Sequence, residues 1–267
     1  MGTLVCFHAH PDDECMMTGG SMARAVAEGH RVVLVVATNG DHGEIPEDLA
    51  KGETLVDRRR AETARSAEVL GVQRVAWLDY ADSGMTGWEQ NDHPRSFVQA
   101  PLDEAAAALA AILREEAADV LTVYDWHGNY GHPDHIKVNT VGHRAAEMAG
   151  TPAVFEATMN RDAMKRFFAE ARNQGVSPQP EGEEWNPDDP ADDGNPMGTP
   201  EIELTHAVDV GEYVMTKKAS IACHRSQVTD AGFFMTLPDE AFRFAFGTEW
   251  FIKKGATHPM REGWLFE

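Results

Sequence analysis

Runs of apolar residues alternate with helical patterns along the first half of the chain. Buried strands are predicted where the apolar, β-branched runs lie, at residues 4–7, 32–38, 75–78 and 120–124. Helices are predicted between and after them, at residues 16–28, 57–70, 102–116 and 133–148. Gly71 fits the position after a helix end, and Pro133 fits a first helical turn. Continuous apolar strands separated by helices are typical of a parallel sheet covered on both faces, so the pattern predicts an α/β fold.

The second half of the chain is less regular. Its predicted elements are a strand at 154–158, a helix near 162–172, an acidic, proline-rich loop at about 175–200, a strand around 207–210 and a helix at 212–223. We interpret them as elements added to the sheet in the C-terminal part. Because no stretch reads as a clean linker, residues 1–267 are interpreted as one domain.

The formal net charge is −21, and much of the acidic excess lies in the loop sequence EGEEWNPDDPADD. So acidic a surface repels phosphate backbones, and nucleic acid is therefore not an expected partner. We expect no signal peptide, and no apolar stretch reaches the roughly 18 residues of a membrane span. Three cysteines without zinc-ribbon spacing favour a reduced cytoplasm as the location. The acidic loop is either an insertion without function or a flap over the active site.

Two clusters of histidine and aspartate follow two of the predicted strands. The first lies in HAHPDDE and the second in GHPDH, and together they contain His10, Asp12, Asp13, His132, Asp134 and His135. Taken alone, the first cluster also fits a polar turn whose aspartate caps the next helix. Because parallel sheets place ligand sites at the carboxyl ends of their strands, we expect the clusters to meet. Two imidazoles and one carboxylate with an open fourth position form the ligand set of a catalytic zinc site, and the cation would compensate the clustered carboxylates.

The spacing within each cluster indicates a division of roles. In H-x-D-D, His10 and one aspartate bind the metal, and the other aspartate stays free to accept a proton from water that the metal has made more acidic. In H-P-D-H, the two histidines lie three positions apart at a helix start. One of them can bind the metal, and the other can reach the opposite side of a bound carbonyl. This combination describes hydrolysis of an amide or an ester.

The two motifs resemble those of the LmbE-like, or PIG-L, family of zinc-dependent N-deacetylases. The resemblance extends from Leu4 to about Gln227, and it includes RRRAETARSAEVLGV and DYADSGM, which are similar to the mycothiol branch. It implies a Rossmann-like α/β fold and a metal-dependent amide hydrolase acting on linear C–N bonds other than peptide bonds. The implied reaction removes an N-acetyl group, or cleaves a related amide, on an N-acetylglucosamine-type or sugar-conjugate substrate. The segment CHRSQ also resembles a late family segment, either one that approaches the substrate or a structural one.

The resemblance further implies a cofactor and its ligands. The cofactor is Zn²⁺, with Fe²⁺ as an alternative in the cell. The implied metal ligands are His10, Asp13 and His135. Asp12 is implied to be the general base.

Other residues receive roles from the same resemblance. His132 is implied to stabilise the oxyanion or to protonate the amine, and Asp134 to support that histidine. Tyr130 is implied to polarise the carbonyl. Arg59 and Asp82 match positions that contact the substrate. An ordinary helix salt bridge and a turn carboxylate are the alternative interpretations of these last two residues.

Two other classes of function remain open at this stage. H-x-D with a distant histidine also fits the facial triad of a non-heme iron(II) oxygenase, although that triad usually lies in an antiparallel β-barrel. The other class is a non-catalytic sugar-binding module. Dinucleotide binding has little support, because no G-x-G-x-x-G follows the first strand. The sequence does not indicate an oligomeric state.

Overall fold

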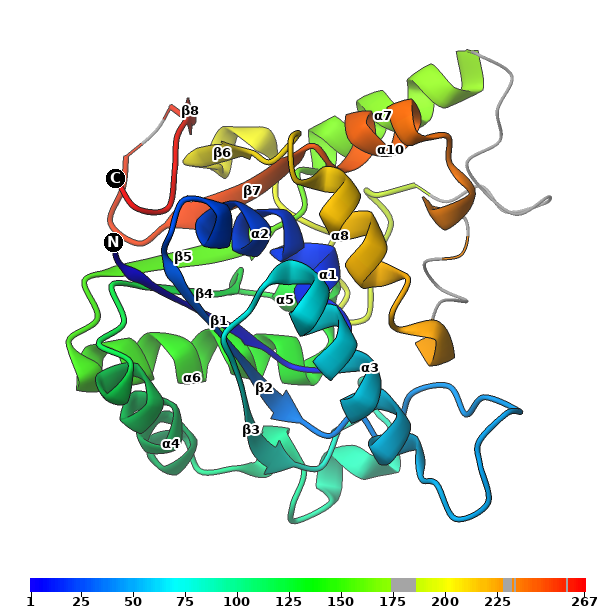
Figure 1. The fold of residues 1–267 in the computed structure, drawn as a ribbon, viewed down its shortest axis with the longest axis vertical. Coiled ribbons are helices and arrows are strands. Elements are labelled where there is room, and N and C mark those ends of the chain that lie inside the picture. Colours follow the sequence, from blue (N-terminus) through cyan, green and yellow to red (C-terminus); the bar gives the residue numbers. More distant parts are fainter. Residues whose placement is uncertain (174–185, 228–231, 233, 258) are drawn as a thin grey trace.

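An eight-stranded sheet runs through the computed structural model, which describes residues 1–173, 186–227, 232, 234–257 and 259–267 (Figure 1). The strand order is β3-β2-β1-β4-β5-β7-β6-β8. The strands are β1 (Thr3–His8), β2 (Arg31–Thr38), β3 (Arg74–Tyr80), β4 (Val120–Tyr124), β5 (Ala153–Thr158), β6 (His206–Asp209), β7 (Thr248–Lys253) and β8 (Arg261–Glu262). Pairing is parallel from β3 through to β5, and β7 is antiparallel to both β5 and β6. The predicted, mostly parallel α/β sheet is confirmed.

Helices cover both faces of the sheet (Figure 1). On one face lie α4 (Leu102–Glu115) and α6 (Pro133–Ala149), and on the other lie α1 (Asp13–Met17), α2 (Gly19–Ala27), α3 (Leu55–Leu70) and α8 (Val214–Ile221). Side chains of β1 alternate between the two cores: Val5 and Phe7 pack with α4 and α6, whereas Leu4 and Cys6 pack with α2 and α3. This alternation explains why the four central residues of the strand, Leu4–Phe7, are all apolar, since neither face meets solvent.

The remaining elements lie around the C-terminal part of the sheet and in the connecting loops. They are α5 (Gly128–Gly131), α7 (Arg161–Asn173), α10 (Asp239–Phe246) and the short 3₁₀ helices η1 (Glu89–Asp92), η2 (Phe97–Gln99), η3 (Glu201–Glu203) and η4 (Arg225–Gln227). α10 packs beside α8 in a third apolar cluster that includes Val214, Ile221 and Phe242. Strands β6, β7 and β8 share the sheet with β1–β5, so we keep the one-domain interpretation.

Several predicted helices have different bounds in the structure; the helix predicted at 212–223, for example, is α8 (Val214–Ile221), and two other differences have a local cause. The helix predicted at 16–28 is two helices, α1 and α2, separated at Thr18. The Thr18 hydroxyl lies 2.8 Å from Nε2 of His8, which fixes the break against the sheet. The helix predicted from Asp57 begins at Leu55, because Thr54 and Asp57 form a capping box at its N-terminus.

Part of the acidic loop lies beside the loop that carries Tyr130. Residues 174–185 lie outside the described residues, whereas residues 186–200 form turns and isolated bridges. The backbone N–H of Asp192 donates to the Tyr130 carbonyl at 2.9 Å, and the Asp192 carboxylate accepts from the N–H of Thr86. The loop therefore contacts the surroundings of the second His/Asp cluster, and its role as a flap or an insertion stays a prediction.

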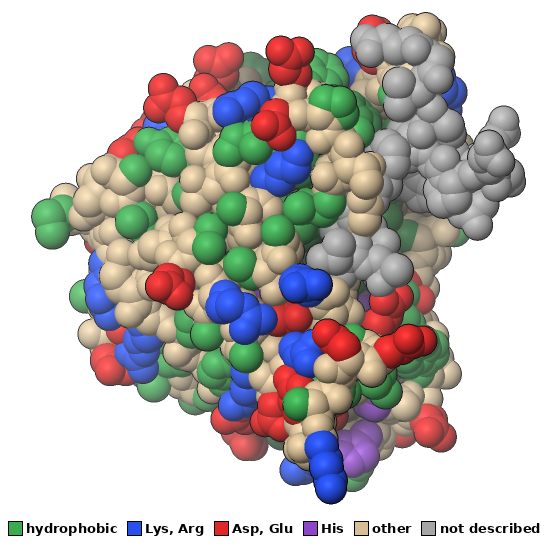
Figure 2. Space-filling model, turned by 45° about the vertical axis from the view of Figure 1, so that its right-hand side comes forward, with side chains coloured by type: hydrophobic (Ala, Val, Ile, Leu, Met, Phe, Trp, Pro, Cys, Tyr) green, Lys and Arg blue, Asp and Glu red, His purple; other side chains and the backbone are tan. Residues whose placement is uncertain are grey.

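Charged side chains of both signs cover the surface. On the face shown in Figure 2, acidic and basic side chains are interspersed among the described residues. Among those residues, no helix is long and apolar enough to cross a membrane.

Candidate metal centre

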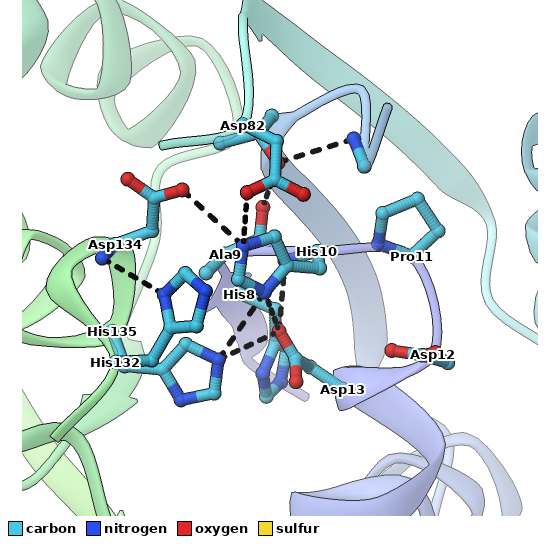
Figure 3. A network of polar contacts seen from close by, with 12 residues as sticks. His8, Ala9, His10, Pro11, Asp12, Asp13, Asp82, His132, Asp134 and His135 are labelled. Carbon is cyan, nitrogen blue, oxygen red and sulfur yellow. Dashed lines mark hydrogen bonds and ion pairs between the residues drawn. The ribbon is translucent and has the colours of Figure 1, made fainter. Parts of the chain in front are cut away.

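The two His/Asp clusters meet at the carboxyl ends of β1 and β4 (Figure 3). β1 and β4 are neighbours in the sheet, so the turn after β1 faces the loop and helix start that follow β4. The first turn ends at Asp12, which has a φ of 103° and precedes α1. The second cluster opens α6, where Pro133 occupies the first turn. The structure thus brings together all six residues of the two motifs.

Three side-chain atoms form a nearly equilateral triangle in this site. His10 Nδ1 lies 3.3 Å from Asp13 Oδ2 and 3.3 Å from His135 Nε2, and Asp13 Oδ2 lies 3.4 Å from His135 Nε2. Tetrahedral zinc with bonds of about 2.0–2.1 Å requires ligand atoms about 3.3–3.4 Å apart. The three atoms therefore have the spacing of one face of a zinc tetrahedron, which leaves the fourth corner open.

Hydrogen bonds behind the two imidazoles fix their protonation. His135 Nδ1 lies 3.2 Å from the carbonyl of Gly128, which can only accept a hydrogen bond, so Nδ1 carries the proton and Nε2 is the free nitrogen. His10 Nε2 lies 3.3 Å from the Asp134 carboxylate, so that nitrogen carries the proton and Nδ1 is free. The two free nitrogens are the ones in the triangle, and this arrangement is usual around metal-binding histidines. Gly128 has a φ of 69°, and a Cβ there would clash with His135.

The charges around the triangle favour a cation. Burial opposes a charge on His10, but Asp82, Asp13 and Asp134 outweigh it and raise the pKa of His10 well above its ordinary value. Burial likewise opposes a charge on Asp13, but His135 and His10 hold the pKa of that carboxyl well below its usual range. A field that favours positive charge at His10 also favours a divalent metal beside it. The donor set and its charge therefore fit a metal ion.

A second set of possible ligands shares His10. Asp82, Asp134 and His10 offer atoms within 4.8 Å of one another, on the Nε2 side of the ring. Asp82 and Asp134 accept backbone N–H groups there, and Asp13 Oδ2 likewise accepts the N–H of His10, so these bonds do not distinguish the two sets. We favour the Nδ1 side because an imidazole and a carboxylate converge there, with His135 Nε2 and Asp13 Oδ2 each 3.3 Å from His10 Nδ1.

His132 is the third imidazole of the site. Its ring centroid lies 4.5 Å from that of His10 and 5.2 Å from that of His135. Nδ1 of His132 accepts the backbone N–H of Asp134 at 3.1 Å, so a neutral ring carries its proton on Nε2. Burial, followed by the charges of His10 and His135, lowers the pKa of His132 to about 2. His132 is therefore a neutral hydrogen-bond donor.

The side chain of Asp134 has a different partner from the expected one. Its carboxylate faces His10 and accepts hydrogen bonds from the hydroxyl and the backbone N–H of Ser83. Only its backbone N–H reaches His132. Asp134 thus contacts His132 through its backbone and His10 through its carboxylate, and its role in supporting His132 stays a prediction.

Arg59 lies beneath the turn, where it contacts Asp12. It is 3% exposed, and its guanidinium donates to the carbonyls of Pro11 and Gly40 and to Asp12 Oδ2, the last at 3.1 Å. The guanidinium is not openly exposed to a substrate, and it does not form an ordinary salt bridge within its own helix. Because it is buried against the turn, it donates to acceptors of the turn instead.

Asp12 is the most exposed carboxylate of the site. The side chain of Asp12 is 28% exposed, against 13% for Asp13 and 6% for Asp82. Burial of the carboxyl raises the pKa of Asp12 to about 6. The charge of Arg59 opposes this shift, and the charge of Asp13 adds to it. Asp12 is thus outside the ligand triangle and open on one side.

Asp82 and Tyr130 complete the set of predicted site residues. Asp82 is buried, with Oδ1 3.5 Å from His10 Nε2, and its backbone N–H donates to Asp41. In this position Asp82 contributes negative charge on the Nε2 side of His10 and matches the turn-carboxylate interpretation. The Tyr130 hydroxyl lies 3.5 Å from His135 Nε2, at the edge of the ligand triangle. Burial, followed by the charge of Asp13, raises the pKa of Tyr130, so its hydroxyl stays protonated.

Two residues of the site, Ser83 and Ser66, escaped the sequence analysis. Ser83 binds Asp134, and Ser66 donates to Glu14, which also contacts His224. The only signal for Ser83 was its place in DYADSGM, after the end of β3. His224 belongs to CHRSQ, and the structure favours the structural interpretation of that segment, since His224 is buried.

Comparisons with known proteins indicate one family. Residues 5–146, just over half of the chain, match the family model of the GlcNAc-PI de-N-acetylases, PIG-L. A 1D-myo-inositol 2-acetamido-2-deoxy-alpha-D-glucopyranoside deacetylase from Thermomonospora curvata is 38% identical over 261 residues, which cover 91% of this chain and 87% of that protein.

Two solved structures share the fold. The N,N'-diacetylchitobiose deacetylase from Pyrococcus horikoshii has a TM-score of 0.59 at 23% identity, covering 94% of this chain and 83% of that one. The 4-carboxy-2-hydroxymuconate hydratase from Pseudomonas putida has a TM-score of 0.57 at 17% identity, covering 98% of this chain and 100% of that one. Because these two proteins carry out different reactions, the fold alone does not decide the chemistry. The family match and the sequence relative go further, and they confirm that the chain belongs to the GlcNAc-PI de-N-acetylase, or PIG-L, family.

Proposed function

We propose that this protein is a zinc-dependent hydrolase that removes the acetyl group from an N-acetylglucosamine unit joined to a cyclitol or a similar polyol. The observation that carries the proposal is the triangle of His10, Asp13 and His135, with the Asp12 carboxylate outside it and paired with Arg59. The substrate class follows the Thermomonospora curvata relative, whose name describes a glucosamine-type sugar on inositol. A cytoplasmic location stays part of this proposal.

Each residue of the site has a distinct task in the proposed reaction. His10, Asp13 and His135 would hold the metal. A bound zinc ion supplies Lewis acidity, which makes water more acidic and polarises a carbonyl. Asp12 would accept the proton of the attacking water, since it is near the triangle yet not part of it.

The neutral residues of the site would stabilise the charge that develops on the amide oxygen. His132 carries its proton on Nε2 and would donate it as a hydrogen bond to that oxygen. The Tyr130 hydroxyl, beside His135, would donate from the opposite side. Asp134 would act through His10, whose Nε2–H it accepts. Arg59 and Asp82 would act through Asp12 and His10, so we no longer propose direct substrate contacts for them.

The two competing classes have weaker support. An iron(II) oxygenase would use the same two histidines and one carboxylate. However, the site lies at the end of a parallel sheet, whereas that triad usually lies in an antiparallel barrel. A sugar-binding module gives no reason for Asp12 to stand free beside a ligand triangle.

Metal content and acetate release together test the proposal. Protein stripped by a chelator should release no acetate from an N-acetylglucosaminyl-inositol, and one equivalent of zinc should restore the release. Iron(II) and cobalt serve as comparison metals, and free N-acetylglucosamine serves as the comparison substrate. Release of acetate by metal-free protein would overturn the mechanism. Oxygen consumption that depends on iron(II), without acetate release, would favour the oxygenase.

A further inference from the structure

A buried polar cluster lies directly beneath the turn that carries Asp12. Glu14, on α1, is fully buried, and each of its carboxylate oxygens has a partner. Oε1 accepts from the Ser66 hydroxyl at 2.7 Å and from His224 Nε2 at 2.7 Å. Oε2 accepts the backbone N–H of Asp12 at 2.9 Å. Glu14 therefore connects the proposed general base to a helix and to a segment far along the sequence.

The backbone of Asp12 needs such a partner. Asp12 has a φ of 103°, which is uncommon for a residue other than glycine. Its N–H points across the turn to Glu14, and its side chain is held by Arg59. Residue 12 is thus fixed at two points, at its backbone by Glu14 and at its carboxylate by Arg59.

One face of α3 carries the groups that join these parts. Arg59, Glu62 and Ser66 are spaced by three and four residues, so they project from the same side of the helix. Arg59 binds Asp12, and Ser66 binds Glu14. Glu62 accepts hydrogen bonds from the backbone N–H and the hydroxyl of Ser226, next to His224 in CHRSQ. The late segment is therefore attached to α3 and to Glu14 by separate contacts.

A second metal site does not explain this cluster. Glu14, Cys15 and His224 do offer three ligand atoms within 4.8 Å of one another. However, Glu14 and His224 already share a hydrogen bond of 2.7 Å, and Cys15 Sγ donates to the carbonyl of Asp12 at 2.8 Å. Each group thus has a polar partner within the turn and its supports, so a hydrogen-bonded scaffold accounts for the arrangement.

We propose that Glu14 and His224 are positioning residues for Asp12. Glu14 holds the backbone of the turn so that the Asp12 carboxylate stands beside the metal triangle, and His224 holds Glu14. This inference rests on the proposed role of Asp12 as the general base, and it adds residues from the C-terminal third of the chain to the catalytic apparatus.

A double-mutant cycle between Glu14→Gln and Asp12→Asn tests the inference, because residues that act through one another are not additive. Glu14→Gln should lower kcat by about 10²-fold, the usual effect of displacing a reacting group by about 1 Å. Bound zinc should stay at one equivalent, and KM should change little. In the Asp12→Asn background, the same substitution should lower kcat by less than about threefold. His224→Gln keeps an N–H donor and should retain more activity than His224→Ala.

Glu249→Gln is the matched control. Glu249 is also a buried glutamate that accepts backbone N–H groups at a helix start, those of Gly20 and Ser21, but it does not contact Asp12. We expect it to lower the melting temperature and to leave kcat of the folded protein within about twofold in both backgrounds.

The outcomes separate this inference from the proposed function. If Asp12→Asn itself keeps full turnover, the general base is wrong and both proposals fail. If Asp12→Asn is impaired but Glu14→Gln costs the same factor in both backgrounds, only the positioning role is overturned. Loss of zinc from Glu14→Gln would also overturn it, since Glu14 would then support Asp13. If Glu14→Gln does not fold, His224→Gln takes its place in the same cycle.

Discussion

Substituting Asn for Asp12 or for Asp13 should have opposite consequences, although the two residues are neighbours with the same side chain. Asp13 Oδ2 takes part in two of the three edges of the ligand triangle. Loss of a hydrogen-bond partner of a metal ligand typically lowers metal affinity by roughly 10–100-fold. Because Asp13 is itself a proposed ligand, replacing it by a neutral amide should lower the zinc affinity by more than that. Asp12 lies outside the triangle, so Asp12→Asn should keep its zinc.

The expected loss of turnover in Asp12→Asn is about 10²–10⁴-fold, the share of a general base. This loss corresponds to about 2.7–5.4 kcal/mol in the activation barrier. The loss of stability should be smaller, about 1–3 kcal/mol for one hydrogen bond to a charged group. Arg59 keeps the carbonyls of Pro11 and Gly40 as acceptors, so the variant should stay folded.

The assay combines zinc content, acetate release and the pH profile of kcat/KM. In the native enzyme kcat/KM should rise with pH as Asp12 loses its proton. The midpoint should be no higher than about 6, since a bound cation lowers the pKa from its value in the metal-free site. This ascending limb should be absent in Asp12→Asn. Zinc lost from Asp12→Asn and kept by Asp13→Asn would exchange the two roles, and equal zinc loss from both would refute a free base at this turn.

Three further predictions concern other parts of the molecule. Asp134→Asn should lower the zinc affinity by about 10–100-fold, because His10 loses the carboxylate that accepts its Nε2–H. Competition with a chelator measures this affinity, and an unchanged value would contradict the assigned ligand nitrogen. Lys217→Met should lower the free energy of unfolding, measured in urea, by about 3–5 kcal/mol, because it leaves the carboxylate of Glu249 buried without its cation. A loss below about 1 kcal/mol would contradict the stabilising role of this buried pair. Glu116 has a lowered pKa of about 2, caused by hydrogen bonds from two arginines, so the stability it contributes should be present above pH 4.5 and lost as the pH falls towards 2. In Glu116→Gln, melting temperatures between pH 7 and pH 2.5 should fall less steeply than in the native protein, and parallel curves would contradict this contribution.

The parts of the fold that follow local patterns were predictable. The apolar run at 120–124 is β4 with the same bounds, and the run at 32–38 lies within β2. β7 was missed although its sequence, TEWFIK, is rich in strand-forming residues, and β8 has only two residues to reveal it. The antiparallel placement of β7 between β5 and β6 depends on contacts between distant segments, which no local pattern contains.

The site, like the fold, has features that the sequence predicted and features that it did not. Placing His10 and His135 near each other required only two strand ends at one sheet edge, and the sequence predicted that much. The partners of Arg59 and Asp134 depended on which buried acceptors and donors face them in three dimensions. The Arg59 guanidinium donates to the carbonyls of the turn, and the Asp134 carboxylate binds Ser83 and His10, and sequence position alone did not indicate these partners.

The distance in sequence between His224 and Glu14 has a consequence for the order in which the protein matures. These residues are 210 positions apart, whereas the proposed metal ligands all lie within the first 135 residues. A chain still being synthesised exposes the ligands first, and contacts between distant segments form late because closing a long loop is entropically costly. On the proposed roles, the contact between His224 and Glu14 would therefore be among the last to form, and a chain without its last third would lack the support that positions Asp12.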